Sequence, residues 1–271
     1  MADIVALCLD KLRQILTRER VERSMVFFKS AGQWLILAGA ALALINALVV
    51  GIKLNSFKLF LTGVGAVIVI AVLQYIARLF LSACASVNQS TDCSLSSPAV
   101  PDSIGLLACL ASLGILLTGI GGALIMNQFS MALGAMLLSA LVLWLAGIAL
   151  NPSLLQLKIT PACAAEEAMG VLSFFMKLPL VVLPLLYFLV AMLGVLMSFN
   201  MLFGGRPFQL PSALEFMAFP MFDMLGGLSL TLLALALPFG MYVFFLIAYL
   251  AVDLIRSIVS LPGKIDGQRR N

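Results

Sequence analysis

The carboxylates are the groups in this chain best suited to chemistry, but their spacing does not build a catalytic site. Glu166 and Glu167 are adjacent. Neighbouring side chains on a helix point about 100° apart, so these two cannot act together on one substrate atom. We expect them to stabilise the N-terminus of the helix that follows, where negative charge is favoured. With Arg78, they are the only basis for the alternative of a membrane enzyme that acts on lipid.

The chain lacks the residue patterns that usually bind metals or carry out nucleophilic catalysis. The chain has five cysteines and no histidine, and the cysteine spacing matches no zinc site. The absence of histidine also excludes a Ser–His hydrolase, and neither a Walker loop nor a dinucleotide glycine fingerprint is present. We therefore predict no catalytic residue, no metal site and no cofactor, and a protein that is not an enzyme. The five thiols belong to Cys8, Cys84, Cys93, Cys109 and Cys163.

The composition indicates that lipid is the solvent for most of the chain. Hydrophobic residues make up 63% of its 271 residues and charged residues only 10%, whereas soluble domains carry about 45–50% and about 25%. Six stretches have the roughly 20 apolar residues that a helix needs to cross a bilayer, and they lack the alternation of barrel strands. The fold class predicted is an all-α integral membrane protein with six transmembrane helices. The outer limits of the stretches are 31–52, 57–81, 104–126, 129–150, 171–199 and 222–250.

The basic residues predict the orientation. With six spans both termini share one face, and 13 of the 16 lysines and arginines fall on it. The positive-inside rule therefore places both termini in the cytoplasm, in an inner membrane or its equivalent. Lys177, about six residues into the fifth span, is expected to snorkel to this face. Arg269 and Arg270 are too short a cluster to predict nucleic-acid binding.

We expect three regions along the chain. Residues 1–30 hold Ile4, Cys8, Leu12 and Ile15 at helical spacing, which predicts an amphipathic helix on the cytoplasmic interface. This helix is either a plain anchor or a docking site for a partner. Residues 31–256 form the six-helix domain, and residues 257–271 form a short polar tail.

The six spans are predicted to form three helical hairpins, 31–81, 104–150 and 171–250. An asparagine stands at the outer end of each odd span: Asn55, Asn127 72 residues later, and Asn200 after 73 more. Asparagine tolerates the left-handed conformation at a helix end. The spacing therefore predicts pseudo-repeats of about 72 residues.

Small residues predict where helices pack. In lipid, helices associate through close packing, so stripes of small residues mark contacts, either within this chain or with other membrane subunits or a second copy. The neutral polar residues inside the spans are expected to form hydrogen bonds between helices. The small residues are Gly39, Ala43, Ala47, Gly51, Gly114, Thr118 and Gly122. The polar residues are Asn46, Thr62, Gln74, Thr118 and Ser139.

The third hairpin departs from the other two. Residues 201–221 are inserted at its outer end, and prolines at 179, 184 and 238 are expected to kink its spans. The insert predicts an interfacial segment, which either seals the bundle or binds a ligand or partner from outside. The candidate residues for that binding are Arg206, Glu215, Phe216 and Asp223.

Two functions follow from these features. The first is a structural or accessory subunit of a membrane assembly, which packs through its small-residue helix faces. The alternative is a passive channel or a transporter of small solutes or lipids, which would use helices 5 and 6 and segment 201–221. The alternative requires Asn46, Gln74 or Thr118 to line a water-filled cavity. The predicted partners are the lipid bilayer and other membrane subunits, not nucleic acid.

Overall fold

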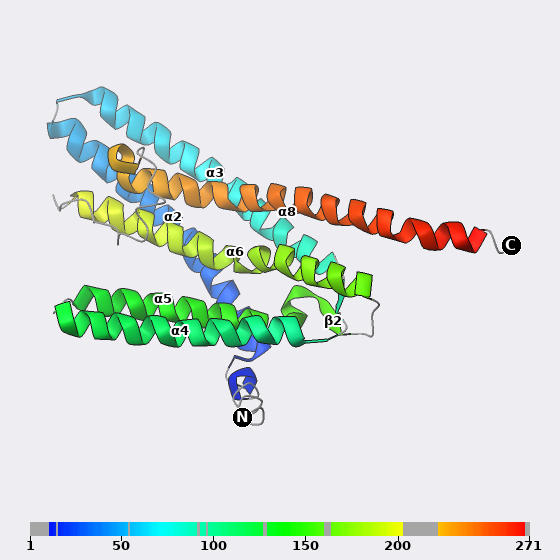
Figure 1. Cartoon of the computed structure of the whole chain (residues 1–271). Coiled ribbons are helices and arrows are strands. Elements are labelled where there is room, and N and C mark those ends of the chain that lie inside the picture. Colours follow the sequence, from blue (N-terminus) through cyan, green and yellow to red (C-terminus); the bar gives the residue numbers. More distant parts are fainter. Residues whose placement is uncertain are drawn as a thin grey trace. The chain divides into compact units, whose positions relative to one another are not determined.

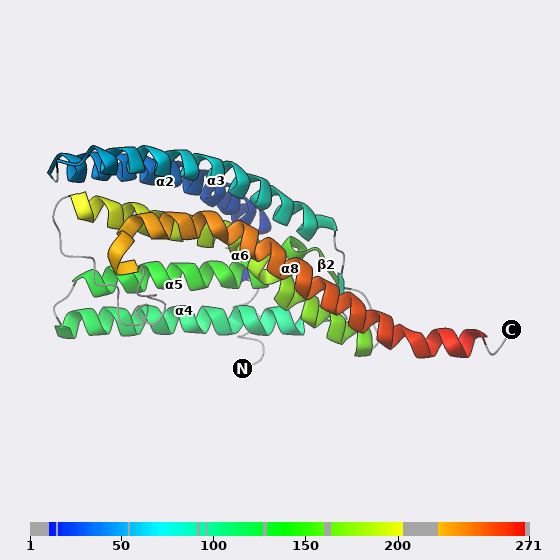
Figure 2. The same ribbon diagram turned by 90° about the horizontal axis from the view of Figure 1, so that it is seen from above.

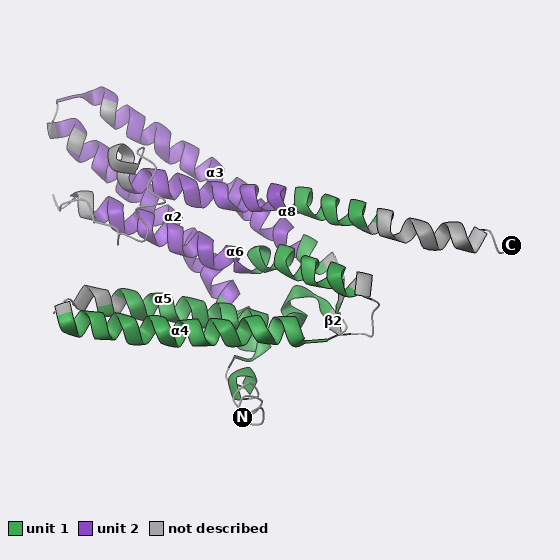
Figure 3. Cartoon of the chain, in the orientation of Figure 1, with its two compact units in different colours: residues 1–24, 87–181, 245–271 green, residues 25–86, 182–244 purple. Residues whose placement is uncertain are grey.

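The computed structural model describes the chain in two compact units (Figure 3). Unit 1 comprises residues 1–24, 87–181 and 245–271, and unit 2 comprises residues 25–86 and 182–244. Four helices pass from one unit into the other, so each unit is built from parts of several helices. The described residues are 11–14, 16–53, 55–90, 93–95, 97–126, 129–159, 164–202 and 222–268.

The described chain is almost entirely helical. Its elements are α2 (Arg18–Lys53), α3 (Phe57–Ser90), β1 (Cys93–Leu95), α4 (Ala99–Met126), α5 (Phe129–Ala149), η1 (Pro152–Leu155), β2 (Leu157–Ile159), α6 (Ala164–Leu202) and α8 (Phe222–Gln268). Figure 1 shows them coloured along the sequence.

Five helices have the length and composition of membrane spans, namely α2, α3, α4, α6 and α8. Their large apolar side chains are widely exposed, for example Leu117 at 70% and Ile125 at 85%, as expected of helices that face lipid rather than water. Helices of this length and composition indicate a membrane protein. The predicted sixth span corresponds to α5, in which the described apolar residues run from Gly134 to Ala149. Six spans remain a prediction.

In unit 1, α4 and α5 form an antiparallel pair that lies side by side in both views (Figures 1 and 2). Their contact is close at Gly105, where an added Cβ would lie 2.6 Å from the side chain of Leu150. β1 precedes this pair and β2 follows it, and the two strands pair in parallel with Cys93 opposite Leu157. These two three-residue strands are an addition to the all-α prediction. They were missed because neither segment has the length of an ordinary strand.

The N-terminal residues of unit 1 attach to the start of α4 and the end of α5. Arg13 pairs with Asp102 at 2.6 Å, and the side-chain amide of Asn151 donates to the carbonyl of Leu16 at 2.7 Å. Residues 1–10 of the predicted interfacial helix lie outside the described residues. From Arg18, α2 runs without a break to Lys53, so the expected boundary at residue 30 falls inside one helix.

In unit 2, α2 and α3 form an antiparallel hairpin (Figure 1). Asn55 occupies the turn with a φ of 47°, and its neighbour Ser56 donates a backbone hydrogen bond to Gly51 at 2.9 Å. This αL ending satisfies carbonyls that the helix would otherwise leave open. The hairpin packs with the parts of α6 and α8 that belong to the unit. The buried core of unit 2 includes Ile36, Ile70, Ala77, Leu183, Tyr187 and Leu235.

Several helices extend beyond their apolar stretches. α3 continues to Ser90 and α4 begins at Ala99, whereas the corresponding apolar stretches end at residue 81 and resume at residue 104. α6 begins at Ala164, which places Glu166 and Glu167 in its first turn, as expected. α8 continues to Gln268 and includes most of the predicted tail. Polar residues can continue a helix past the bilayer because the backbone bonds are local.

Candidate functional site

The polar side chains inside the spans connect neighbouring helices. Asn46 on α2 donates from its side-chain amide to the carbonyl of Ser198 on α6 at 3.2 Å, and Gln74 on α3 donates to the carbonyl of Gln33 on α2 at 3.1 Å. In the α4–α5 pair, the hydroxyls of Ser112 and Ser139 lie 2.9 Å apart and both side chains are buried. Hydrogen bonds between helices were predicted for Asn46, Gln74 and Ser139.

Two threonines of the same predicted group bond within their own helices instead. The Thr62 hydroxyl donates to the carbonyl of Lys58 at 2.9 Å, and that of Thr118 donates to Gly114 at 2.7 Å. Both threonines are exposed. A threonine hydroxyl can donate its hydrogen bond to a backbone carbonyl of the preceding turn in the same helix. It therefore needs no acceptor on a neighbouring helix.

A close helix contact in unit 2 joins α6 and α8. Gly194 and Ser198 on α6 face Gly227 and Thr231 on α8, so that two small residues four apart meet two others at the same spacing. A Cβ added at Gly194 would lie 3.1 Å from the carbonyl oxygen of Gly227, and one added at Gly227 would collide with backbone atoms of Gly194 and Ser198. The backbones can approach this closely only because both positions are glycine.

Gly39 of α2 packs against the same contact between α6 and α8. A Cβ there would lie 3.2 Å from the Thr231 hydroxyl oxygen, and that hydroxyl donates to the carbonyl of Gly227 at 2.9 Å. Thr231 is fully buried. Three helices of unit 2 therefore meet around one small polar side chain. None of the four residues at the α6–α8 contact was among the predicted packing residues, although Gly227 and Thr231 repeat the spacing of Gly194 and Ser198.

The other predicted packing residues have mixed surroundings. Ala47 of α2 faces Gly63 of α3, Gly51 is buried at the end of α2, and Ala43 is half-buried. On α4, a Cβ added at Gly114 would meet no atom within 4 Å, and Gly122 is half-buried. The stripe on α2 thus faces helices of its own chain, and the stripe on α4 is open at Gly114 and Thr118.

Lys177 does not snorkel, which corrects the prediction from sequence. Its side chain is 0% exposed, and its ammonium donates a hydrogen bond to the carbonyl of Leu155 at 3.0 Å. The 3-10 turn η1 brings this carbonyl to α6, and Ser173 and Phe174, one turn earlier on α6, are also buried. A buried ammonium needs such an acceptor because burial removes its water. The sequence showed only the depth of Lys177 in the span.

A second side chain also holds η1. Asn88, near the end of α3, donates from its amide nitrogen to the carbonyl of Leu154 at 3.2 Å. Two helices therefore bind consecutive carbonyls of one short turn. Gln156 ends that turn in the left-handed conformation with a φ of 53°.

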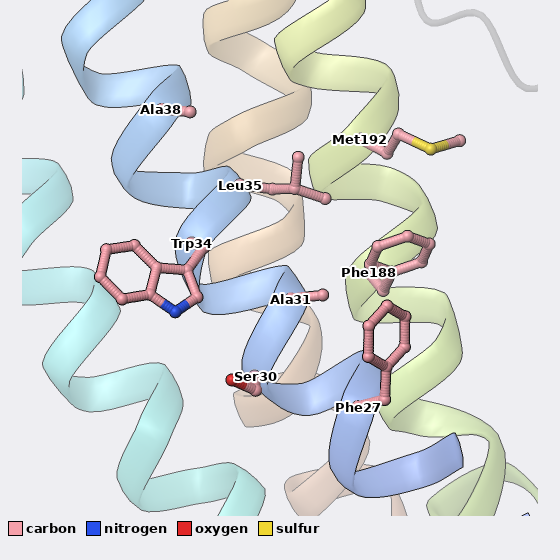
Figure 4. Close-up of a pocket in the computed structure, with 8 residues that line it drawn as sticks. All are labelled: Phe27, Ser30, Ala31, Trp34, Leu35, Ala38, Phe188 and Met192. Atoms are coloured by element: carbon pink, nitrogen blue, oxygen red, sulfur yellow. The ribbon is translucent and has the colours of Figure 1, made fainter.

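An apolar groove runs between α2 and α6 in unit 2, and we call it the α2–α6 groove (Figure 4). Its volume is about 530 Å³. Figure 4 shows the rings of Phe27 and Phe188 close together between the two helices, with Ala31 and Leu35 beside them. Its lining residues are Phe27, Ser30, Ala31, Trp34, Leu35, Ala38, Phe188 and Met192. The groove contains none of the residues predicted to line a channel.

The predicted outer-face site lies almost entirely outside the described residues. Arg206, Glu215 and Phe216 lie outside the described residues, and only the backbone of Asp223 is described, as part of α8. Of the three corner asparagines, Asn55 occupies a left-handed turn and Asn127 lies outside the described residues. Asn200 belongs to α6, two residues before that helix ends.

Comparisons with known proteins add no relative. No protein-family model, no curated protein and no solved structure matches this chain.

Proposed function

We propose that this chain is a non-enzymatic, structural or accessory subunit of a membrane assembly, with both termini in the cytoplasm. The observation that carries this proposal is the use of the polar groups inside the spans. Asn46, Gln74 and the Ser112–Ser139 pair are engaged in bonds between helices. Such bonds stabilise a packed bundle and leave these groups unavailable to solvate a passing solute.

The charges of the described spans support the same role. Coupled transport needs ionisable groups or broken helices deep in the membrane. Among the side chains that the structure describes, Lys177 is the only buried charge, and it binds the carbonyl of Leu155. That bond holds η1 against α6, which is a structural task.

The α4–α5 pair offers a surface for a partner. Added Cβ atoms at Gly114 and Gly121, which are seven residues apart on α4, would meet no atom within 4 Å. Leu110, Leu117 and Leu124, also at intervals of seven, are largely exposed on this helix. A second helix could approach the backbone closely here, as small residues allow in lipid.

Purification from native membranes in a mild detergent tests the proposal. We expect a membrane protein to copurify with the wild-type chain and to be lost from the double variant Gly114→Ile/Gly121→Ile. The matched control is Gly65→Ile on α3, which also has open space around its Cβ position and should retain the partner.

Reconstitution into liposomes tests the transport alternative. The structural role predicts that the purified chain adds no flux of ions or small solutes above that of empty vesicles. Solute flux from a chain that purifies without any stable partner would overturn the proposal in favour of a channel.

A further inference from the structure

We draw no further inference here: the strongest candidate, the apolar α2–α6 groove of unit 2 between Phe27 and Met192, carries none because nothing in the described part of the chain shows what covers it.

Discussion

The ammonium of Lys177 on α6 donates a hydrogen bond of 3.0 Å to the carbonyl of Leu155 in η1, and the lysine side chain is completely buried. The bond joins two segments of unit 1 that lie 22 residues apart. This bond contributes to the stability of the fold because the site is buried. A buried carbonyl that loses its donor cannot replace the lost hydrogen bond with one to water.

Replacement of Lys177 by Met should therefore destabilise the protein. Methionine fills a similar volume but cannot donate, so the Leu155 carbonyl loses this bond at a cost of about 1–3 kcal/mol. The free energy of unfolding in mixed detergent micelles measures the effect. Lys58→Met, at an exposed lysine, is the control and should change stability by less than about 0.5 kcal/mol. Equal stability of both variants would contradict the assigned role.

Gly227→Ala should weaken the α6–α8 contact. The new methyl group would strike backbone atoms of Gly194 and Ser198, and neither helix backbone can yield without separating. Overpacking of this kind costs about 1–3 kcal/mol. Gly240→Ala on the same helix has open space at its Cβ position and should gain up to about 1 kcal/mol from helix propensity. The midpoint of thermal unfolding should move in opposite directions in the two variants.

Asn46→Leu should lower stability modestly. The substitution removes the bond from α2 to the Ser198 carbonyl and replaces the amide with an apolar group that lipid tolerates. Hydrogen bonds between membrane helices contribute about 0.6 kcal/mol on average and up to about 2 kcal/mol. Thr62→Val, whose hydroxyl bonds only within α3, is the matched control and should be close to neutral. A larger loss in the threonine variant would refute this assignment.

Reporter fusions should locate both termini in the cytoplasm. The prediction rests on the 13 basic residues assigned to that face against three on the other, under the positive-inside rule. A green fluorescent protein at either terminus should therefore fluoresce, and alkaline phosphatase at the same positions should be inactive. Active phosphatase at one terminus only would show an odd number of spans, as would result if α5 does not cross the membrane.

The helices of this protein could be predicted because their formation in lipid is a local property. A run of about 20 apolar residues must satisfy its backbone internally wherever it stands in the chain. For the same reason, the asparagine and glutamine inside the spans were expected to find partners on other helices. Asn46 and Gln74 do so because an apolar solvent offers no other acceptor.

What composition and spacing determined, therefore, is the class of protein, the approximate positions of its long apolar helices, and the role of Asn46 and Gln74 in bonds between helices. They did not distinguish these residues from Thr62 and Thr118, which bond within their own helices. Only the tertiary structure decided which segments meet. It brought Gly227 and Thr231 of α8 against Gly194 and Ser198 of α6, paired β1 with β2, and buried Lys177 against η1. It also opened the α2–α6 groove beside Trp34. These contacts depend on the shapes of surfaces far apart in the chain, and all apolar helices are alike to the lipid that surrounds them.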